Sequence, residues 1–318
     1  MTSERDNLSP LAQLTERQAK RHGMHTHIDG LTLSCFTRAS EPFVTVQHPV
    51  YSVVLQGEKE AMICDQLVRY TASQSLIAGV DLPVTSRIVE ASTATPYLAI
   101  SVALDLSNVA ELIGNQPHGP AAEAAAPFGV MDFDPALADP LARLLELLDR
   151  PADVPVLAPM INREIVWRLL HSPFAPLLKA LAWPEGNIAR IGRATEWIRE
   201  NVSEPLRVAE LAERVHMSVP SFHRHFKKVT TVSPLQFQKQ MRLHIARKRL
   251  LGAESVAVVA FNVGYESLSQ FNRDYRKFYG LAPTQDVANL RQELRDHASP
   301  NSAASAAPLP SIPNESTR

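Results

Sequence analysis

The sequence predicts an α+β protein of two domains, an N-terminal β-barrel with helices behind it and a C-terminal domain built only from helices. Three observations predict this class. The hydrophobic period is near two from Leu31 to about Leu106, it changes to helical spacing after about residue 135, and one helix-turn-helix pattern occurs twice between residues 208 and 279. The chain of 318 residues is long enough for two domains with their own cores.

The composition indicates a globular protein, because 45% of the residues are hydrophobic and only 20% are charged. Two cysteines, Cys35 and Cys64, are too few for a disulfide framework, so we expect a reducing compartment. No apolar run approaches the roughly 20 residues that cross a bilayer, and the first ten residues are too polar for a secretory signal. We therefore expect a cytoplasmic protein without a membrane partner.

The N-terminal half begins with residues 1–30, which we expect to form a polar arm with a short helix. Short strand-like runs then follow one another, at residues 50–56, 61–64, 74–79, 85–90 and 97–104. Turn-forming residues separate these runs, namely Gly57, Gly79, Pro83 and Pro96. Many short strands with regular turns predict a β-barrel or a sandwich.

Helical spacing follows a Pro-, Ala- and Gly-rich stretch at residues 118–133, which we expect to be a loop. Two apolar stripes have this spacing, Leu137, Leu141, Leu144, Leu145 and Leu148 in the first, and Ile161, Ile165, Val166 and Leu169 in the second. They predict two amphipathic helices within residues 135–171 that pack against the barrel, form a subunit interface, or do both.

A segment around Pro173, Pro176, Pro184 and Gly186 is expected to be a linker, with the domain boundary at residues 182–187. Residues 188–290 are then expected to be helical. The tail at residues 299–318 is rich in Ser, Ala, Pro and Asn, so we expect it to be disordered.

The charge of the chain is unevenly distributed. The net charge is −1, yet residues 188–298 carry 18 Lys and Arg against 11 Asp and Glu, and no acid occurs between Arg214 and Ala253. A basic module within a nearly neutral chain indicates a unit that binds a polyanion.

The first helix-turn-helix copy occupies about residues 208–229. One apolar face defines its first helix, with Val208, Leu211, Ala212 and Val215 at helical spacing. Ser218 is placed to cap the second helix by accepting a bond from one of its free amides. The apolar side of that helix carries Phe222, Phe226 and Val229, and the opposite side carries Pro220, His223, Arg224 and Lys227.

The second copy occupies about residues 256–279 and repeats the first with a shift of 48 or 49 residues. Gly264 suits a turn that needs a positive φ, Ser267 is placed as a cap, and Gly280 is placed to end the second helix. The apolar side of that helix carries Phe271, Tyr275 and Phe278, and the outward side carries Ser269, Asn272, Arg273 and Arg276.

A helix without internal breakers is predicted between the two copies, over residues 234–251. It would be about 27 Å long at ~1.5 Å per residue, which could hold two recognition helices about one DNA turn apart, roughly 34 Å. A helix with one apolar and one basic face can enter a major groove, where Arg reads guanine and Lys neutralises phosphate. The alternative is a small α bundle without a nucleic-acid role.

Residues of about 188–290 resemble the DNA-binding domain of the AraC/XylS family of bacterial transcription regulators. Three segments carry the resemblance, LRVAELAERVHMSVPSFHRHFKKVT (206–230), SPLQFQKQMRLHIARKRLL (233–251) and VAFNVGYESLSQFNRDYRKFYGLAP (259–283). The resemblance implies base contacts from Pro220, His223 and Arg224 in the first unit and from Ser269, Gln270 and Arg273 in the second. We expect backbone contacts from Lys227, Lys228, Asn272, Arg276 and Lys277.

Two positions depart from the family pattern. Pro220 has no N–H donor, so only a van der Waals contact to a base is expected there. Thr231 stands where the family commonly has glycine, so the first recognition helix is expected to end differently or with strain.

Residues 49–84, PVYSVVLQGEKEAMICDQLVRYTASQSLIAGVDLPV, resemble the cupin-type N-terminal domain of one subgroup of AraC-type regulators. The resemblance implies that residues 31–181 form an effector-sensing barrel with a helical dimer interface. Candidate pocket residues for an unknown small-molecule effector are the aromatic side chains Phe36, Tyr51, Tyr70 and Tyr97.

No catalytic residues or cofactor are expected. His25 and His27 have the His-x-His spacing of metal cupins, but no glutamate follows until Glu41, so we expect no metal site. Asp132 and Asp134 are expected to be loop and cap residues, and the cysteines to be buried rather than redox-active.

The sequence thus predicts an effector-responsive regulator, more typically an activator, that acts as a homodimer on promoter DNA with RNA polymerase in the bacterial cytoplasm, at the nucleoid. Two alternatives remain open, a metal-dependent cupin enzyme with an appended helical domain and a constitutive DNA binder whose barrel is a dimerisation scaffold.

Overall fold

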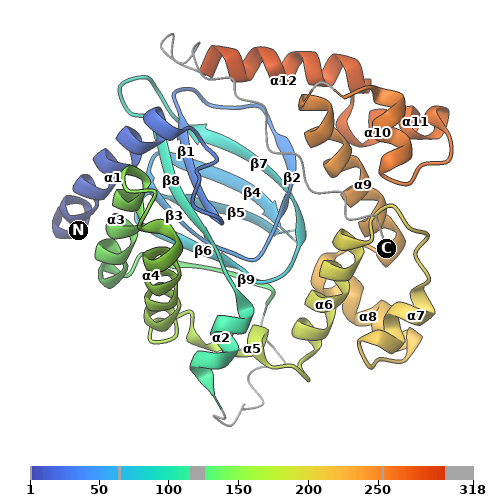
Figure 1. Ribbon diagram of the computed structural model, residues 1–318, viewed down its shortest axis with the longest axis horizontal. Coiled ribbons are helices and arrows are strands. Elements are labelled where there is room, and N and C mark those ends of the chain that lie inside the picture. Colours follow the sequence, from blue (N-terminus) through green and yellow to red (C-terminus); the bar gives the residue numbers. More distant parts are fainter. Residues whose placement is uncertain (1, 64–65, 115–125, 253, 298–318) are drawn as a thin grey trace. The chain divides into compact units, whose positions relative to one another are not determined.

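A computed structural model describes residues 2–63, 66–114, 126–252 and 254–297 (Figure 1). The chain divides into two compact units, residues 1–241 and 242–318, and the boundary falls inside one long helix. Cys64, the expected tail at residues 299–318 and the first half of the expected loop at residues 118–133 lie outside the described residues. The class is α+β, with an antiparallel sheet domain followed by a helical region.

The first unit contains two antiparallel sheets, as the period of two predicts. The five-stranded sheet has the order β1-β8-β3-β6-β9 and the four-stranded sheet has the order β2-β7-β4-β5. The strands are β1 Leu31–Phe36, β2 Phe43–Gln47, β3 Val50–Gln56, β4 Glu58–Ile63, β5 Gln66–Thr71, β6 Gln74–Ala78, β7 Leu82–Glu90, β8 Tyr97–Ala103 and β9 Phe128–Asp132. β9 corrects the expectation of a loop, because its residues pair with β6 from Phe128 to Asp132.

The register separates the two faces of the five-stranded sheet. Leu33, Ile100 and Val53 lie opposite one another on β1, β8 and β3, and all three are fully buried. Helix α1 (Thr2–His22) packs on these three strands, so this face is covered by helix. The alternate residues Thr32, Ser101 and Ser52 point to the other face and keep part of their exposure.

Helix α1 is longer than the short helix expected in the N-terminal arm. Its buried face includes Leu11, Thr15, Gln18 and Ala19, which follow helical spacing. Two of these four are polar, and Thr15 donates its hydroxyl proton to the Leu11 carbonyl at 2.8 Å. A hydropathy pattern does not identify such a face, which explains the underestimate.

The helices that follow the strands bury the two predicted apolar stripes within the chain. These elements are α2 Leu106–Ile113, the 3₁₀ turns Pro135–Leu137 and Leu147–Asp149, α3 Ala138–Glu146 and α4 Val154–Leu169. Asp134 caps the first 3₁₀ turn, as expected, by accepting the Ala136 amide at 2.9 Å. The expected linker is wrong in part, because α5 (Ala175–Ala182) is a helix there, with Leu178 and Leu181 buried.

The helical region begins with α6 Asn187–Glu200, α7 Val208–Arg214 and α8 Val219–Thr230. Helix α9 (Pro234–Leu251) has the predicted bounds, and α10 Val256–Asn262, α11 Leu268–Tyr279 and α12 Pro283–His297 follow it. The second unit has its own apolar cluster, to which Leu243, Val259, Phe271 and Tyr275 belong.

Candidate nucleic-acid interface and effector site

Helix α8 has the two faces that the sequence predicts. Phe222 and Phe226 are fully buried, Val229 is buried, and the Phe226 ring meets the Phe237 ring edge-on at 5.5 Å. The residues expected to contact DNA from this helix are all exposed, namely Pro220, His223, Arg224, Lys227 and Lys228. The first helix-turn-helix therefore presents one basic surface, held from behind by aromatic packing.

Helix α11 repeats this arrangement in the second unit. Phe271 and Tyr275 are fully buried, and their ring centroids lie 5.5 Å apart. The residues expected to contact DNA from this helix are again all exposed, namely Ser269, Gln270, Asn272, Arg273, Arg276 and Lys277. Asp274, the acidic residue of α11, points inward and is buried, so the exposed side of this helix carries no negative charge.

Both turns between the paired helices need a positive φ. Gly264 supplies it in the second copy with φ of +92°, as the sequence predicts. The equivalent residue in the first copy is His216, which has φ of +54° despite its side chain. The His216 carbonyl accepts a bond from Arg190 Nη1 at 2.7 Å, so α6 holds this turn in place.

The two recognition helices also begin differently. Ser267 caps α11 and accepts the Gln270 amide at 3.5 Å. Ser218 occupies the cap position of α8 with extended backbone angles, but its side chain makes no capping bond. The expected bond is therefore wrong, and Pro220 explains part of this, because it removes one of the two amides that a cap side chain usually binds.

The ends of the two helices confirm the departure expected at Thr231. Gly280 ends α11 at φ of +80°, and Thr231 ends α8 in the same left-handed region at φ of +64°. A β-branched residue in this region carries steric strain. The amide of each residue still closes its helix with a 2.8 Å bond, to Lys227 O or to Arg276 O.

A buried polar network supports α11 from behind, and sequence reasoning missed it. Asp286 on α12 accepts two bonds of 2.8 Å from Arg247 on α9 and one of 2.7 Å from the Tyr275 hydroxyl. Burial and the bond to Asp286 raise the pKa of Tyr275 above its usual value. The carboxylate of Asp286 thus connects α9, α11 and α12. These bonds fix the orientation of α11 about its own axis.

The inner faces of the two sheets hold three of the four candidate effector residues. Phe36 and Tyr97 lie opposite each other on β1 and β8, with ring centroids 6.3 Å apart. Burial raises the pKa of Tyr97, and the neighbouring Tyr70, from the other sheet, raises it further. Tyr51 lies elsewhere, because it points to the helix side, where its hydroxyl is 2.9 Å from Ser75 Oγ and its ring meets Phe174.

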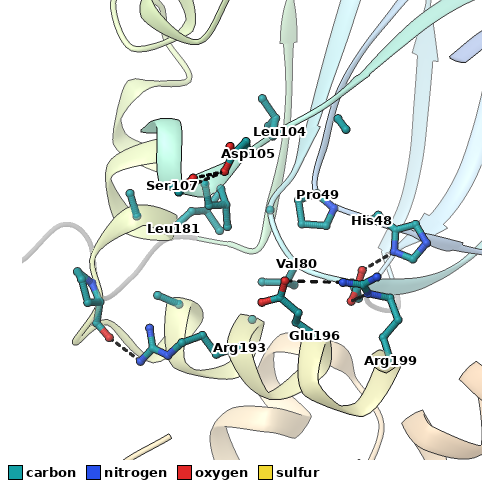
Figure 2. A pocket seen from close by; sticks show the side chains of 18 residues that line it. His48, Pro49, Val80, Leu104, Asp105, Ser107, Leu181, Arg193, Glu196 and Arg199 are labelled. Carbon is teal, nitrogen blue, oxygen red and sulfur yellow. Dashed lines mark hydrogen bonds and ion pairs between the residues drawn. The ribbon is translucent and has the colours of Figure 1, made fainter. Parts of the chain in front are cut away.

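A separate pocket of about 640 Å³ lies between the sheet domain, α2, α5 and α6 (Figure 2). At one end, Arg199 of α6 and His48 converge on Asp81, with Arg199 Nε at 3.3 Å and His48 Nδ1 at 2.5 Å from its carboxylate. The Asp81 side chain is only 4% exposed. The ion pair between Arg199 and Asp81 therefore joins α6 to the sheet domain at a buried carboxylate. Sequence reasoning did not identify these contacts, because Asp81 is far from His48 and from Arg199 along the chain.

Other candidate chemistry is not assembled in the described part of the chain. No group of three or more His, Cys, Asp or Glu residues that could hold a metal ion is found among those residues. Burial raises the pKa of the half-buried Cys35 thiol, which disfavours the reactive thiolate. No described helix has the length and apolarity to span a membrane.

Two family models match this chain. The model described as AraC-type transcriptional regulator N-terminus matches residues 27–177, and the model described as helix-turn-helix domain matches residues 211–289. The first match covers the two sheets and helices α2 to α4 but not α1, and the second covers most of the helical region. The first match thus lies within the first compact unit, whereas the second spans the boundary between the two units.

Curated relatives match this chain over only part of their length. The transcriptional regulator ArgR of Pseudomonas aeruginosa is 30% identical over 98 residues, which are 30% of each chain. The transcriptional activator RhaS of Salmonella schwarzengrund is 26% identical over 156 residues, 48% of this chain and 54% of that protein. The chain thus spans about a third to a half of the length of these relatives, which are named as transcriptional regulators.

Solved structures of ToxT from Vibrio cholerae share the fold. An apo ToxT variant superposes with a TM-score of 0.58 at 8% identity, over 81% of this chain and 97% of that one. ToxT with a bound unsaturated fatty acid gives 0.55 at 9% identity, over 83% of this chain and 97% of that one. At this identity the likeness concerns the fold alone.

Proposed function

Because the chain belongs to the AraC-type transcriptional regulators, we propose that it binds promoter DNA sequence-specifically and responds to a small molecule. The duplicated recognition helix carries this proposal. In both copies an aromatic side is buried while the predicted DNA-contacting residues are exposed on the opposite side. Such a helix is anchored by its apolar side, which leaves its basic side free to enter a major groove.

Each recognition helix combines base reading with phosphate neutralisation. Arg224 and Arg273 are the side chains with the best geometry for guanine, and Gln270 can pair with adenine. His223 and Ser269 add hydrogen-bonding groups, while Pro220 contributes only van der Waals contact. The lysines and arginines at the helix edges bind phosphate and supply most of the sequence-independent affinity: Lys227, Lys228, Arg276 and Lys277.

The sheet domain is the proposed sensor, a cupin-type module with its effector between the two sheets. The polar and aromatic side chains on the inner faces, several of them only partly buried, support this position, and ToxT provides a precedent for a bound small molecule in the same fold. An effector changes transcription only if it favours one arrangement of the protein. The pair between Asp81 and Arg199 offers the link, because α6 packs on α8.

A homodimer through α4 is part of the proposal. The predicted stripes are buried within the chain, so they leave the opposite face of α4 for a partner. On that face Val156, Met160 and Trp167 are 65%, 63% and 50% exposed. Three large apolar side chains on one helix face favour contact with a second copy of the chain.

Activation through RNA polymerase at the bacterial chromosome is the proposed output, in line with the relatives that are named activators. Genome-wide mapping of the protein's binding sites tests the function. We expect reproducible sites that share one motif with two conserved blocks about ten base pairs apart. Binding without a shared motif, or no enrichment at any promoter, would contradict the proposal.

A further inference from the structure

Lys59 lies on β4 and points into the space between the two sheets. Its partners in register are Ile88 on β7 and Tyr70 on β5, which are 2% and 4% exposed. Residues directly opposite in antiparallel strands share a face, so all three side chains point the same way. The Lys59 ammonium lies 6.0 Å from the centre of the Phe43 ring and 5.9 Å from that of the Tyr70 ring.

The charge of Lys59 has no carboxylate partner among the described residues. Its two neighbours on β4 show the contrast, because Glu58 pairs with Arg69 and Glu60 pairs with Arg87 on the outer face. An inward lysine is unfavourable unless it is paired, and two ring faces compensate this cost only in part. Among the described residues, the inner face thus holds a positive charge without a matching negative charge.

Ser86 provides a second polar group in the same place. It is 2% exposed, and its hydroxyl has no hydrogen-bond partner in the described structure. Ser86 lies opposite Ala61 on β4 and opposite Phe43 on β2, so it is a diagonal neighbour of Lys59. A buried hydroxyl without a partner is costly unless a ligand or a water molecule completes its bonds.

The side chains around these two groups are aromatic and incompletely packed. Tyr70 and Tyr97 approach from opposite sheets, and Phe36 lies beside Tyr97. Although they point inward, Phe36, Phe43 and Lys59 are only partly buried. These three side chains are therefore not completely packed by their neighbours and keep some contact with solvent.

We propose that this space binds a small carboxylic acid with an apolar body, whose carboxylate pairs with Lys59 and accepts a bond from the Ser86 hydroxyl. The aromatic side chains would contact the apolar body. The inference rests on the proposed function, because it assigns a chemical class to the effector of the same domain. It does not involve the pocket beside α6.

The test measures binding of matched acids and amides to the full-length protein by isothermal titration calorimetry. The probes are 3-phenylpropanoate against 3-phenylpropanamide and decanoate against decanamide, so that the two arms separate aromatic from aliphatic bodies. Because a charge-assisted hydrogen bond is stronger than a neutral one, we expect an acid to bind about 10- to 100-fold more tightly than its amide.

Three variants assign the preference to a residue. Lys59→Met should abolish the preference for the acid, Lys59→Arg should retain most of it, and Ser86→Ala should weaken acid binding several-fold. The exposed Lys179 on α5 supplies the matched control, and Lys179→Met should leave the preference unchanged. Thermal melting of each variant identifies any that fails to fold, and the comparison of acid with amide on the wild-type protein still tests the role of the charge.

Equal binding of acid and amide would overturn the inference, as would an acid preference that survives Lys59→Met in the folded variant. Binding of none of the probes at millimolar concentration would overturn it as well. DNA binding is measured on the same preparation without any acid. If the protein binds promoter sites but none of the acids, only the inference about the ligand fails. If the protein binds no DNA, the proposed function fails.

Discussion

Individual residues show where the two helix-turn-helix copies differ in strain. Two backbone positions need a positive φ in each copy, the turn and the end of the recognition helix. The second copy has Gly264 and Gly280 there, whereas the first has His216 and Thr231. No atom lies close to the space that a Cβ of Gly280 would occupy, so only the φ angle favours glycine. The first copy therefore carries strain that the second avoids.

Thr231→Gly should stabilise the protein. The change removes the steric strain of a β-branched side chain in the left-handed region, which should raise the free energy of unfolding by about 1 kcal/mol. It also removes one local hydrogen bond, from the Thr231 hydroxyl to the Thr230 carbonyl, and this loss offsets part of the gain. Urea denaturation measures the effect. Thr231→Ala is the control, because alanine keeps the Cβ and loses the hydroxyl, so it should not stabilise. Equal or lower stability for the glycine variant would argue against strain at this position.

At this scale the sequence predicts the recognition helices better than the sheets. A helix places residues at ~100° intervals, so the exposed side of α8 and α11 could be assigned from spacing alone. The direction of Tyr51 could not be, because a shift of one residue in strand register moves every side chain to the other face. Lys59 escaped notice for the same reason, since its inward position depends on its pairing with Tyr70.

Among the elements, α11 is held most specifically, through the carboxylate of Asp286. Burial raises the pKa of Tyr275 and that of Tyr265, whose ring packs on Phe271. Both residues are buried, so their ionisation is linked to unfolding of this part of the chain.

Stability should fall as the pH rises above about 10, the usual pKa of tyrosine. Above that pH the unfolded chain releases the Tyr275 and Tyr265 protons while the folded chain keeps them, so each residue lowers the free energy of unfolding by up to about 1.4 kcal/mol per pH unit. Tyr275→Phe should cost about 1 kcal/mol at neutral pH, because it loses the bond to Asp286, and should flatten the alkaline slope. Urea titrations across this pH range measure both, and an unchanged slope would contradict the account.

Asp81→Asn should loosen α6. The carboxylate joins this helix to the sheet domain through Arg199, and its replacement should cost about 1 kcal/mol, since Arg199 still reaches water. Amides of residues 187–200 should then exchange with solvent roughly fivefold faster. Glu196→Gln is the control, because Glu196 is exposed and lies 3.7 Å from the Arg199 guanidinium. If both variants changed the exchange rate of α6 equally, Asp81 would not be the link between the sheet domain and α6.

Elements with strong apolar periodicity were predictable and elements without it were not. The paired helices from Val208 onward and the bounds of α9 follow directly from spacing and breakers. Helix α1 was underestimated because polar residues occupy its buried face. Helix α5 was missed because Pro176 suggested a linker, whereas proline is well tolerated in the first helical turn.

For the whole molecule, the proposed dimer should depend on the exposed face of α4. Met160→Glu places a charge in the proposed interface and should raise the dimer dissociation constant at least tenfold. Sedimentation velocity over a concentration series measures it. Leu67→Glu on β5 is the matched control, because Leu67 is 65% exposed and Met160 is 63% exposed. A wild-type monomer, or equal effects of the two variants, would exclude this interface.

At the same scale, the sequence predicts the class and the order of the two domains, because period two and period 3.6 occupy different parts of the chain. It does not predict the salt bridge between Asp81 and Arg199 or the isolated charge of Lys59. The salt bridge joins residues far apart in sequence, and the inward position of Lys59 depends on strand register, so no local pattern encodes either of them.

The most direct test of the central claim compares Arg273→Ala with Lys227→Ala on one footprinted site. Arg273→Ala should weaken binding by about 1–3 kcal/mol and relax the preference at one base pair, since the arginine reads a base edge. Lys227→Ala should weaken binding to all duplexes alike and reduce the slope against log salt by about one, since the lysine binds phosphate. If neither variant changed the footprint or its affinity at low and moderate salt, these helices would not lie in the major groove.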